Sequence, residues 1–191
     1  MIGVGSQSVE CIMKRTAATA FVLGCLLATP SLAALKPGDA APDFTAQVAL
    51  GGEESTFSLA KALKDGPVVL YFFPKAFTKG CTAEAHDFAE AAAQYKAAGA
   101  TLIGMSADDI GTLHQFSIQE CSAKFPVAAD PDLKVIKAYD AALIRVGSMG
   151  IADRISYVIG TDGKVVYVHS DRNPEKHVAN TLEAVKALQK K

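Results

Sequence analysis

The sequence has no tryptophan, no large excess of charge of either sign, and no hydrophobic run long enough to cross a membrane. Its 191 residues contain 19 Lys and Arg against 20 Asp and Glu, which gives a formal net charge of −1. A protein without a basic excess cannot neutralise many phosphates, so nucleic acid is not expected as a partner. The apolar run 17–28 is about twelve residues long, short of the roughly 20 that a spanning helix needs.

Histidine is scarce and scattered, and this argues against a histidine-based metal site. The four histidines show no spacing typical of metal ligands, so a metal site is not expected; they are His86, His114, His169 and His177. Hydrophobic residues make up 50% of the chain and charged residues 20%, which is typical of a globular protein rather than a disordered one. The length favours a single domain.

The first 33 residues have the order of an export signal. Lys14-Arg15 form a short basic region, the apolar run 17–28 follows, and Ser31-Leu32-Ala33 gives a small-x-small cleavage pattern. We therefore interpret residues 1–33 as a signal peptide and residues 34–191 as the mature domain. Met13 stands directly before the basic pair, which leaves residues 1–12 as a candidate over-extended start.

A second interpretation of the same segment is a lipid anchor. The stretch Val22-Leu23-Gly24-Cys25 loosely resembles a lipobox, but the apolar run continues through Leu26-Leu27 and a peptidase site follows. Either route predicts an exported protein, in the periplasm of a bacterium. Removal of residues 1–33 leaves two cysteines, Cys81 and Cys121, which form either a structural disulfide or a redox site.

The mature chain predicts an α/β fold. Residues 67–74 are continuously apolar, which is typical of a strand buried on both faces, and residues 81–98 form an Ala-rich amphipathic helix. Thr161-Asp162-Gly163 lies between two strands and is a hairpin signal. The further expected elements are strands at 101–105, 125–128, 155–159 and 164–169, and helices at 111–122, at 132–139 and from 173 onward. This order indicates a thioredoxin-like sandwich, a central mixed sheet flanked by helices, with residues 41–65 as an N-terminal addition.

Cys81 occupies the most informative position in this arrangement. It falls in the first turn of the long helix, directly after the buried strand. Unpaired N–H groups and the helix dipole favour an anion there, so the thiolate, which is the nucleophilic form, is favoured. Thr78 can offer a hydroxyl to this thiolate or to a bound oxygen substrate, and Pro74 fixes the entry to the loop.

The spacing Pro74-x-x-x-Thr78-x-x-Cys81 matches the active-site motif of the peroxiredoxins. The wider run F-F-P-K-A-F-T-K-G-C-T-A-E-A-H-D-F resembles the bacterioferritin-comigratory (PrxQ-type) branch of that family. Similarity continues in residues 36–44, 125–132 and 154–159, so it covers essentially the whole mature chain. The resemblance implies a thioredoxin-like fold with peroxiredoxin N-terminal additions and no cofactor, because sulfur carries the redox change.

The resemblance also implies a role for each matching residue. Cys81 corresponds to the peroxidatic cysteine, which attacks the O–O bond of a hydroperoxide and becomes a sulfenic acid. Pro74 and Thr78 correspond to loop residues that bind the peroxide. Arg154 corresponds to the arginine that stabilises the thiolate and the departing oxygen, a role that suits a guanidinium. Glu84 matches a position that commonly orients this arginine.

The chain departs from the pattern at the resolving cysteine. Many members of the branch carry one five residues after the peroxidatic cysteine, where this sequence has His86. Cys121 resembles the alternative resolver of another subset, but a helix from 111 would place it about 15 Å along the axis. A disulfide needs Cα atoms within roughly 7 Å, so pairing with Cys81 requires local melting. An inert Cys121 with an external resolving thiol, and a static disulfide, remain alternatives.

The expected function is a thiol peroxidase that reduces hydrogen peroxide and organic hydroperoxides. A thioredoxin-like or other thiol reductant would return the electrons, and we expect a monomer. A thiol–disulfide oxidoreductase of the same fold would need a Cys-x-x-Cys motif, whereas 81–84 is Cys-Thr-Ala-Glu. A non-catalytic envelope module that binds redox partners is the other alternative.

Overall fold

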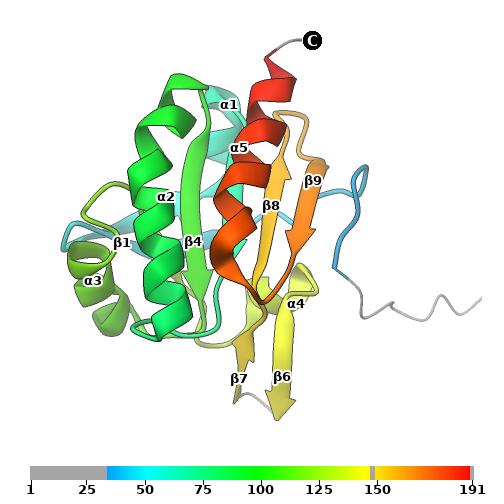
Figure 1. Cartoon of the computed structure of the whole chain (residues 1–191). Helices are drawn as coiled ribbons and strands as arrows, with labels where there is room; N and C mark the ends of the chain where they lie inside the picture. The colour runs from blue at the N-terminus through cyan, green and yellow to red at the C-terminus, as the bar shows by residue number, and fades with distance from the viewer. Residues whose placement is uncertain (1–33, 147–148, 190–191) are drawn as a thin grey trace, which may run out of the picture. The chain divides into compact units, whose positions relative to one another are not determined.

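The computed structural model describes residues 34–146 and 149–189, and the expected signal peptide and Cys25 lie outside this part of the chain (Figure 1). The first half of the domain contains β1 (Thr45–Leu50), β2 (Glu53–Ser58), α1 (Leu59–Asp65), β3 (Val68–Phe72), α2 (Lys79–Ala97), β4 (Thr101–Ser106) and α3 (Ile110–Gln119). The second half contains β5 (Val127–Ala129), α4 (Lys134–Ala138), β6 (Ala142–Val146), β7 (Met149–Ala152), β8 (Ile155–Ile159), β9 (Val165–Ser170), the 3-10 turn η1 (Pro174–Lys176) and α5 (His177–Leu188).

Seven of these strands form one mixed sheet, in the order β2-β1-β5-β4-β3-β8-β9. The central pairs β3–β4 and β4–β5 are parallel, and the pairs towards both edges are antiparallel. Every residue of β3 and β8 is buried, as expected for central strands covered on both faces. The strands β6 and β7 form a separate two-stranded sheet.

Helices cover both faces of the large sheet, and Figure 1 shows α2 and α5 side by side on one of them. On that face Tyr71 stacks on Phe88, with ring centroids 4.3 Å apart, and residues of α3 join the same apolar cluster. On the other face α1 and α4 pack over the alternate residues of β3, such as Leu70 and Phe72. Among the described residues, no helix has the length and apolar composition that spanning a bilayer would require.

The predicted α/β sandwich is confirmed, and so is the order of its elements. The predicted addition 41–65 contains β1 and β2, which extend one edge of the sheet, and α1, which packs on one face of it. The helix predicted at 111–122 is wrong at its end, because α3 stops at Gln119 and Cys121 follows it. Ser122 and Ala123 adopt left-handed φ angles of 50° and 53°, a conformation that cannot continue a right-handed helix.

The hairpin of β6 and β7 was not predicted from the sequence. Its signal is present, because apolar residues alternate at Ala142, Ile144 and Val146 and a Gly-Ser pair follows. The segment is short and its alternation is broken by Leu143, and the structure has a register shift between Ala142 and Ile144. A bulge of this kind disturbs the period of two on which strand prediction depends.

Candidate active site

Cys81 lies in the first turn of α2, at the carboxyl end of the central strand β3. Thr78 is the N-cap residue, and the first backbone hydrogen bond into the helix runs from the Thr82 N–H to the Thr78 carbonyl at 2.9 Å. The thiol of Cys81 is free and only 1% of the residue is exposed. The helix dipole therefore acts on a sulfur that is shielded from bulk water.

The loop between β3 and α2 is held by Asp108, which follows the neighbouring strand β4. The Ala76 N–H donates to Oδ2 of Asp108 at 2.7 Å, and the Ser106 hydroxyl donates to the same oxygen at 2.9 Å. Phe77 has a left-handed φ of 62°, which is uncommon for an aromatic residue and indicates that the loop is held in a defined shape. The Thr78 hydroxyl donates to the Lys75 carbonyl at 2.9 Å.

Arg154, directly before β8, connects the cysteine to the interior. Its guanidinium donates through Nη2 to the Cys81 sulfur at 3.5 Å, through Nη1 to Oε2 of Glu84, and through Nε to the Arg172 carbonyl at 2.9 Å. Burial opposes the charge of Arg154, but Glu84 and Cys81 outweigh it and raise the pKa of the guanidinium. A Cβ at Gly80 would stand 3.2 Å from Nη2, so glycine leaves room for this approach.

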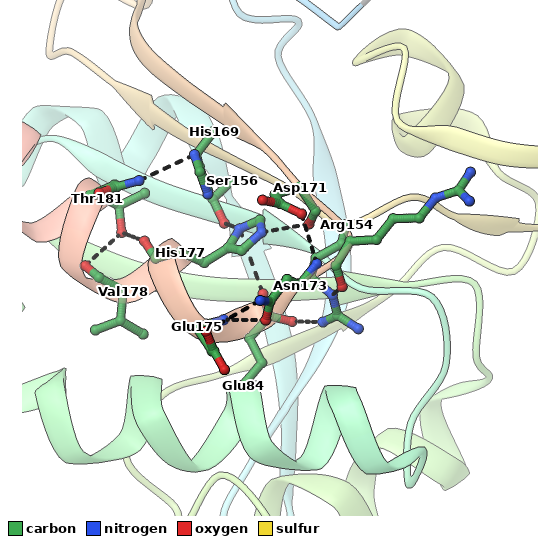
Figure 2. Close-up of polar contacts among 12 residues, drawn as sticks. Glu84, Arg154, Ser156, His169, Asp171, Asn173, Glu175, His177, Val178 and Thr181 are labelled. Atoms are coloured by element: carbon green, nitrogen blue, oxygen red, sulfur yellow. Dashed lines mark hydrogen bonds and ion pairs between the residues drawn. The ribbon is translucent and has the colours of Figure 1, made fainter.

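Glu84 lies on α2 between Arg154 and His177, as Figure 2 shows. The side chain is fully buried, and burial raises its pKa to about 8 despite the charge of Arg154 and its hydrogen bond. Oε1 of Glu84 lies 3.7 Å from Nδ1 of His177 and has no hydrogen-bond partner among the described residues. A second polar group, His177, thus faces the carboxylate from the side opposite to the arginine.

Cys121 is a separate buried thiol. It is fully buried in the apolar cluster that also includes Cys81. Burial and the charge of Glu120 raise its pKa above the usual range of a thiol. Nε2 of His86 lies 2.8 Å from Oε2 of Glu120, which links α2 to the segment that carries Cys121.

The structure brings together three of the six residues selected from the sequence, namely Cys81, Glu84 and Arg154. Pro74 and Thr78 lie in the loop that enters α2, and Cys121 lies in the segment between α3 and β5. Sequence reasoning missed Asp108 and the pair Ser156 and His177. Asp108 follows the carboxyl end of β4, a position that could have suggested it, whereas nothing in the sequence marks His177. Within the described part of the chain, no group of three or more His, Cys, Asp or Glu could hold a metal ion.

Comparison with known proteins identifies the family of the chain. The model of the AhpC/TSA family matches residues 37–168. Peroxiredoxin Q of Triticum aestivum is 33% identical over 176 residues, which is 92% of this chain and 74% of the relative. The bcp peroxiredoxin of Helicobacter pylori is 33% identical over 155 residues, covering 79% of this chain and 98% of the relative.

Solved structures give the same result. The crystal structure of the peroxidoxin BcpB from Mycobacterium tuberculosis aligns with a TM-score of 0.74 at 29% identity, covering 81% of this chain and 98% of that one. Peroxiredoxin Q of Xanthomonas campestris aligns with a TM-score of 0.64 at 26% identity, covering 74% and 89%. The thioredoxin-like peroxiredoxin fold is therefore confirmed. The chain belongs to the AhpC/TSA family and is a thiol-dependent peroxidase that resembles the peroxiredoxin Q and Bcp proteins.

Proposed function

We propose that Cys81 is the residue that attacks the peroxide. The observation that carries this proposal is the 3.5 Å approach of Arg154 Nη2 to the Cys81 sulfur in the first turn of α2. The guanidinium and the helix dipole both stabilise a thiolate at this point. Cys121 follows the C-terminal end of α3, and burial and the charge of Glu120 raise its pKa, so it is the weaker nucleophile.

The thiolate of Cys81 would attack the terminal oxygen of a hydroperoxide. An S–O bond forms as the O–O bond breaks, sulfur is oxidised to a sulfenic acid, and the departing oxygen takes up a proton and leaves as water or an alcohol. Arg154 would stabilise the negative charge that develops on that oxygen. Glu84 would hold the guanidinium in place through Nη1.

Pro74 and Thr78 would form the peroxide-binding side of the loop. The Thr78 hydroxyl is exposed and donates to the Lys75 carbonyl, so a rotation about its side-chain torsion could turn it towards a bound oxygen. Asp108 would keep the loop in shape by accepting from the Ala76 N–H.

Cys121 is the proposed resolving cysteine. Its thiol would attack the Cys81 sulfenic acid, forming a disulfide and releasing water. Cys81 and Cys121 are both buried in the apolar cluster that includes Tyr71, so the two thiols belong to the same side of the sheet. The left-handed pair Ser122 and Ala123 follows Cys121 directly, and strained residues of this kind lower the cost of a local rearrangement.

The burial of Cys121 also supports an alternative in which an external thiol resolves Cys81. A fully buried thiol with a raised pKa cannot attack until its segment opens. A small thiol or a partner dithiol would then reach the sulfenic acid first. In both schemes a thioredoxin-like or other thiol reductant returns the enzyme to its starting state.

Export to the periplasm and a monomeric state complete the proposal. Residues 14–33 carry the basic, apolar and small-residue order of a signal peptide, with cleavage after Ala33. Mass spectrometry of the N-terminus of protein recovered from the periplasm tests this directly, because the proposal requires it to begin at Ala34. Light scattering of the reduced and oxidised protein tests the monomer.

Stopped-flow measurement of peroxide consumption tests the chemistry. Wild type and Cys121→Ser should consume the first equivalent of hydrogen peroxide, and Cys81→Ser should consume none. With a thioredoxin donor, Cys121→Ser should fail to turn over repeatedly if Cys121 resolves. Sustained turnover by Cys121→Ser would assign resolution to the external thiol, and reaction of Cys81→Ser would contradict the role of Cys81.

A further inference from the structure

His177 is a fully buried histidine that the reaction described above does not use. It is the first residue of α5, and its ring has polar contacts on both nitrogens (Figure 2). Nε2 lies 2.8 Å from the carbonyl oxygen of Asp171, and Nδ1 lies 2.8 Å from the Ser156 hydroxyl and 3.7 Å from Oε1 of Glu84. His177 lies beside Glu84, Glu84 accepts from Arg154, and Arg154 donates to the Cys81 sulfur, so a series of contacts connects α5 to the thiol.

These contacts determine which nitrogen of His177 carries the hydrogen. A carbonyl oxygen only accepts, so Nε2 must be the donor to Asp171. Burial lowers the pKa of His177 to about 4, so the ring is neutral near pH 7 and Nδ1 is an acceptor. The Ser156 hydroxyl therefore donates to Nδ1.

The same assignment identifies a place for one proton on Glu84. Oε2 accepts from Arg154, whereas the buried Oε1 has no partner among the described residues and faces the acceptor Nδ1. The one lone pair of Nδ1 already accepts from Ser156, so this nitrogen offers Glu84 no donor, and two acceptors facing each other in the interior are unfavourable. A proton on Oε1 removes this repulsion. His177 thus favours the protonated form of Glu84.

The charge balance of the buried cluster makes this proton relevant to the cysteine. With Arg154 positive, Glu84 negative and Cys81 a thiolate, the cluster carries one uncompensated negative charge, which is costly inside a protein. Protonation of Glu84 removes it. The other titratable groups that face His177 are His169 on β9, with ring centroids 4.6 Å apart, and the exposed Asp171, whose pKa is lowered.

We propose that His177 is a positioning residue for the ionisation of Cys81, because it keeps one proton on Oε1 of Glu84 whenever Cys81 is the thiolate. When Cys81 ionises, its S–H bond breaks and the proton passes to solvent, while Glu84 keeps the proton that it already holds below about pH 8. The cluster of Arg154, neutral Glu84 and the thiolate then has no net charge, and the charge of Arg154, not neutralised by Glu84, acts on the sulfur. The proposal rests on the function proposed for Cys81. It implies that α5, which carries His177, affects the ionisation of the active-site thiol.

The matched variants separate this role from a structural one. His177→Gln places an amide near Nε2 and can keep the hydrogen bond to Asp171, but it removes the acceptor beside Glu84. His177→Asn places its amide near Nδ1 and keeps a polar group beside Glu84. Thr181→Val is the control, since Thr181 is buried on the same helix and bonds Tyr95 and the His177 carbonyl, not Glu84.

The readout is the rate at which iodoacetamide alkylates Cys81, followed by mass spectrometry of the Cys81 peptide across a pH series. His177→Gln should shift the ionisation midpoint of Cys81 upward by about half a pH unit, which lowers the thiolate fraction below the midpoint about threefold. In His177→Asn and Thr181→Val the ionisation midpoint of Cys81 should move by less than about half of that shift. A His177→Gln profile equal to that of Thr181→Val would overturn the proposal.

A second variant gives a change of opposite sign and does not depend on the folding of the His177 variants. Ser156→Ala removes the hydroxyl that donates to Nδ1 of His177. Among the described residues, the proton on Glu84 is then the donor that remains beside this nitrogen. The Cys81 midpoint should therefore move downward. An upward move would overturn the proposal, because loss of packing alone would disturb the site in the same direction as His177→Gln.

A double-mutant cycle with Glu84→Gln tests the path of the coupling. In the Glu84→Gln background, which has no titratable group at 84, His177→Gln should leave the Cys81 midpoint unchanged. A full shift in that background would contradict coupling through Glu84. Alkylation needs no peroxide, so failure of this inference is separate from failure of the peroxidase function, which peroxide consumption by wild type measures.

Discussion

Replacement of Arg154 by lysine isolates the geometry of the guanidinium from its charge. Arg154 makes three contacts at once, to the Cys81 sulfur, to Glu84 and to the Arg172 carbonyl. A lysine ammonium is one point charge on a flexible stem and cannot reproduce this fork. Because the side chain is 7% exposed, water cannot easily replace the lost donors.

The size of the expected rate loss can be taken from the loss of one hydrogen-bond donor to the reacting atoms. Removal of one preorganised donor from a transition state typically costs about 10²–10³-fold in rate, roughly 3–4 kcal/mol. Lysine keeps the positive charge and part of the thiolate stabilisation, so we expect the lower end, a loss of about 10²-fold in the rate constant for hydrogen peroxide.

Single-turnover stopped flow on the reduced enzyme measures this rate constant without the reductant step. Arg172→Lys is the matched control: its side chain is exposed, lies 3.8 Å from Asp153, and contacts the site only through its backbone carbonyl. The control should react like wild type. An Arg154→Lys enzyme that retains its rate to within about threefold would refute the assignment of Arg154 to the transition state.

Three further predictions follow from single contacts. Gly80→Ala should press on Arg154 Nη2, 3.2 Å away, and slow peroxide reduction in the same stopped-flow assay. Ser122→Gly should relieve the left-handed φ of 50°, stabilise the protein by up to about 1 kcal/mol in urea unfolding and slow formation of the Cys81–Cys121 disulfide; faster formation would contradict the proposed role of strain. Burial raises the pKa of Glu84 from 4.5 to about 8, so the folded state holds a proton that the unfolded state has lost and stability falls as pH rises through 8. Glu84→Gln should remove about 2 kcal/mol of that fall between pH 6 and pH 8, measured by urea unfolding at both.

The sequence was sufficient to predict the features that repeat along the chain or stand close together in it. The apolar run of β3 and the spacing of Pro74, Thr78 and Cys81 are local patterns, so both the fold and the nucleophile could be predicted. Arg154 and Glu84 were predicted only through resemblance, because their contact spans 70 residues and depends on how β8 packs against α2.

The rest depends on contacts that no local pattern encodes. The end of α3 at Gln119 reflects the left-handed residues after Cys121, which are Ser and Ala rather than the usual glycine. His177 meets Glu84 only because α5 lies beside α2 over the sheet. The burial of His177 at the start of α5 is a property of the folded chain that no local pattern indicates.

The central claim is that peroxide oxidises Cys81, with Arg154 at its sulfur. Its most direct test is to treat reduced Cys121→Ser with one equivalent of hydrogen peroxide, trap sulfenic acid with dimedone and locate the adduct by peptide mass spectrometry. The account predicts an adduct on Cys81, and a much smaller amount when Arg154→Lys is combined with Cys121→Ser. Peroxide consumption with no adduct on Cys81 would contradict it.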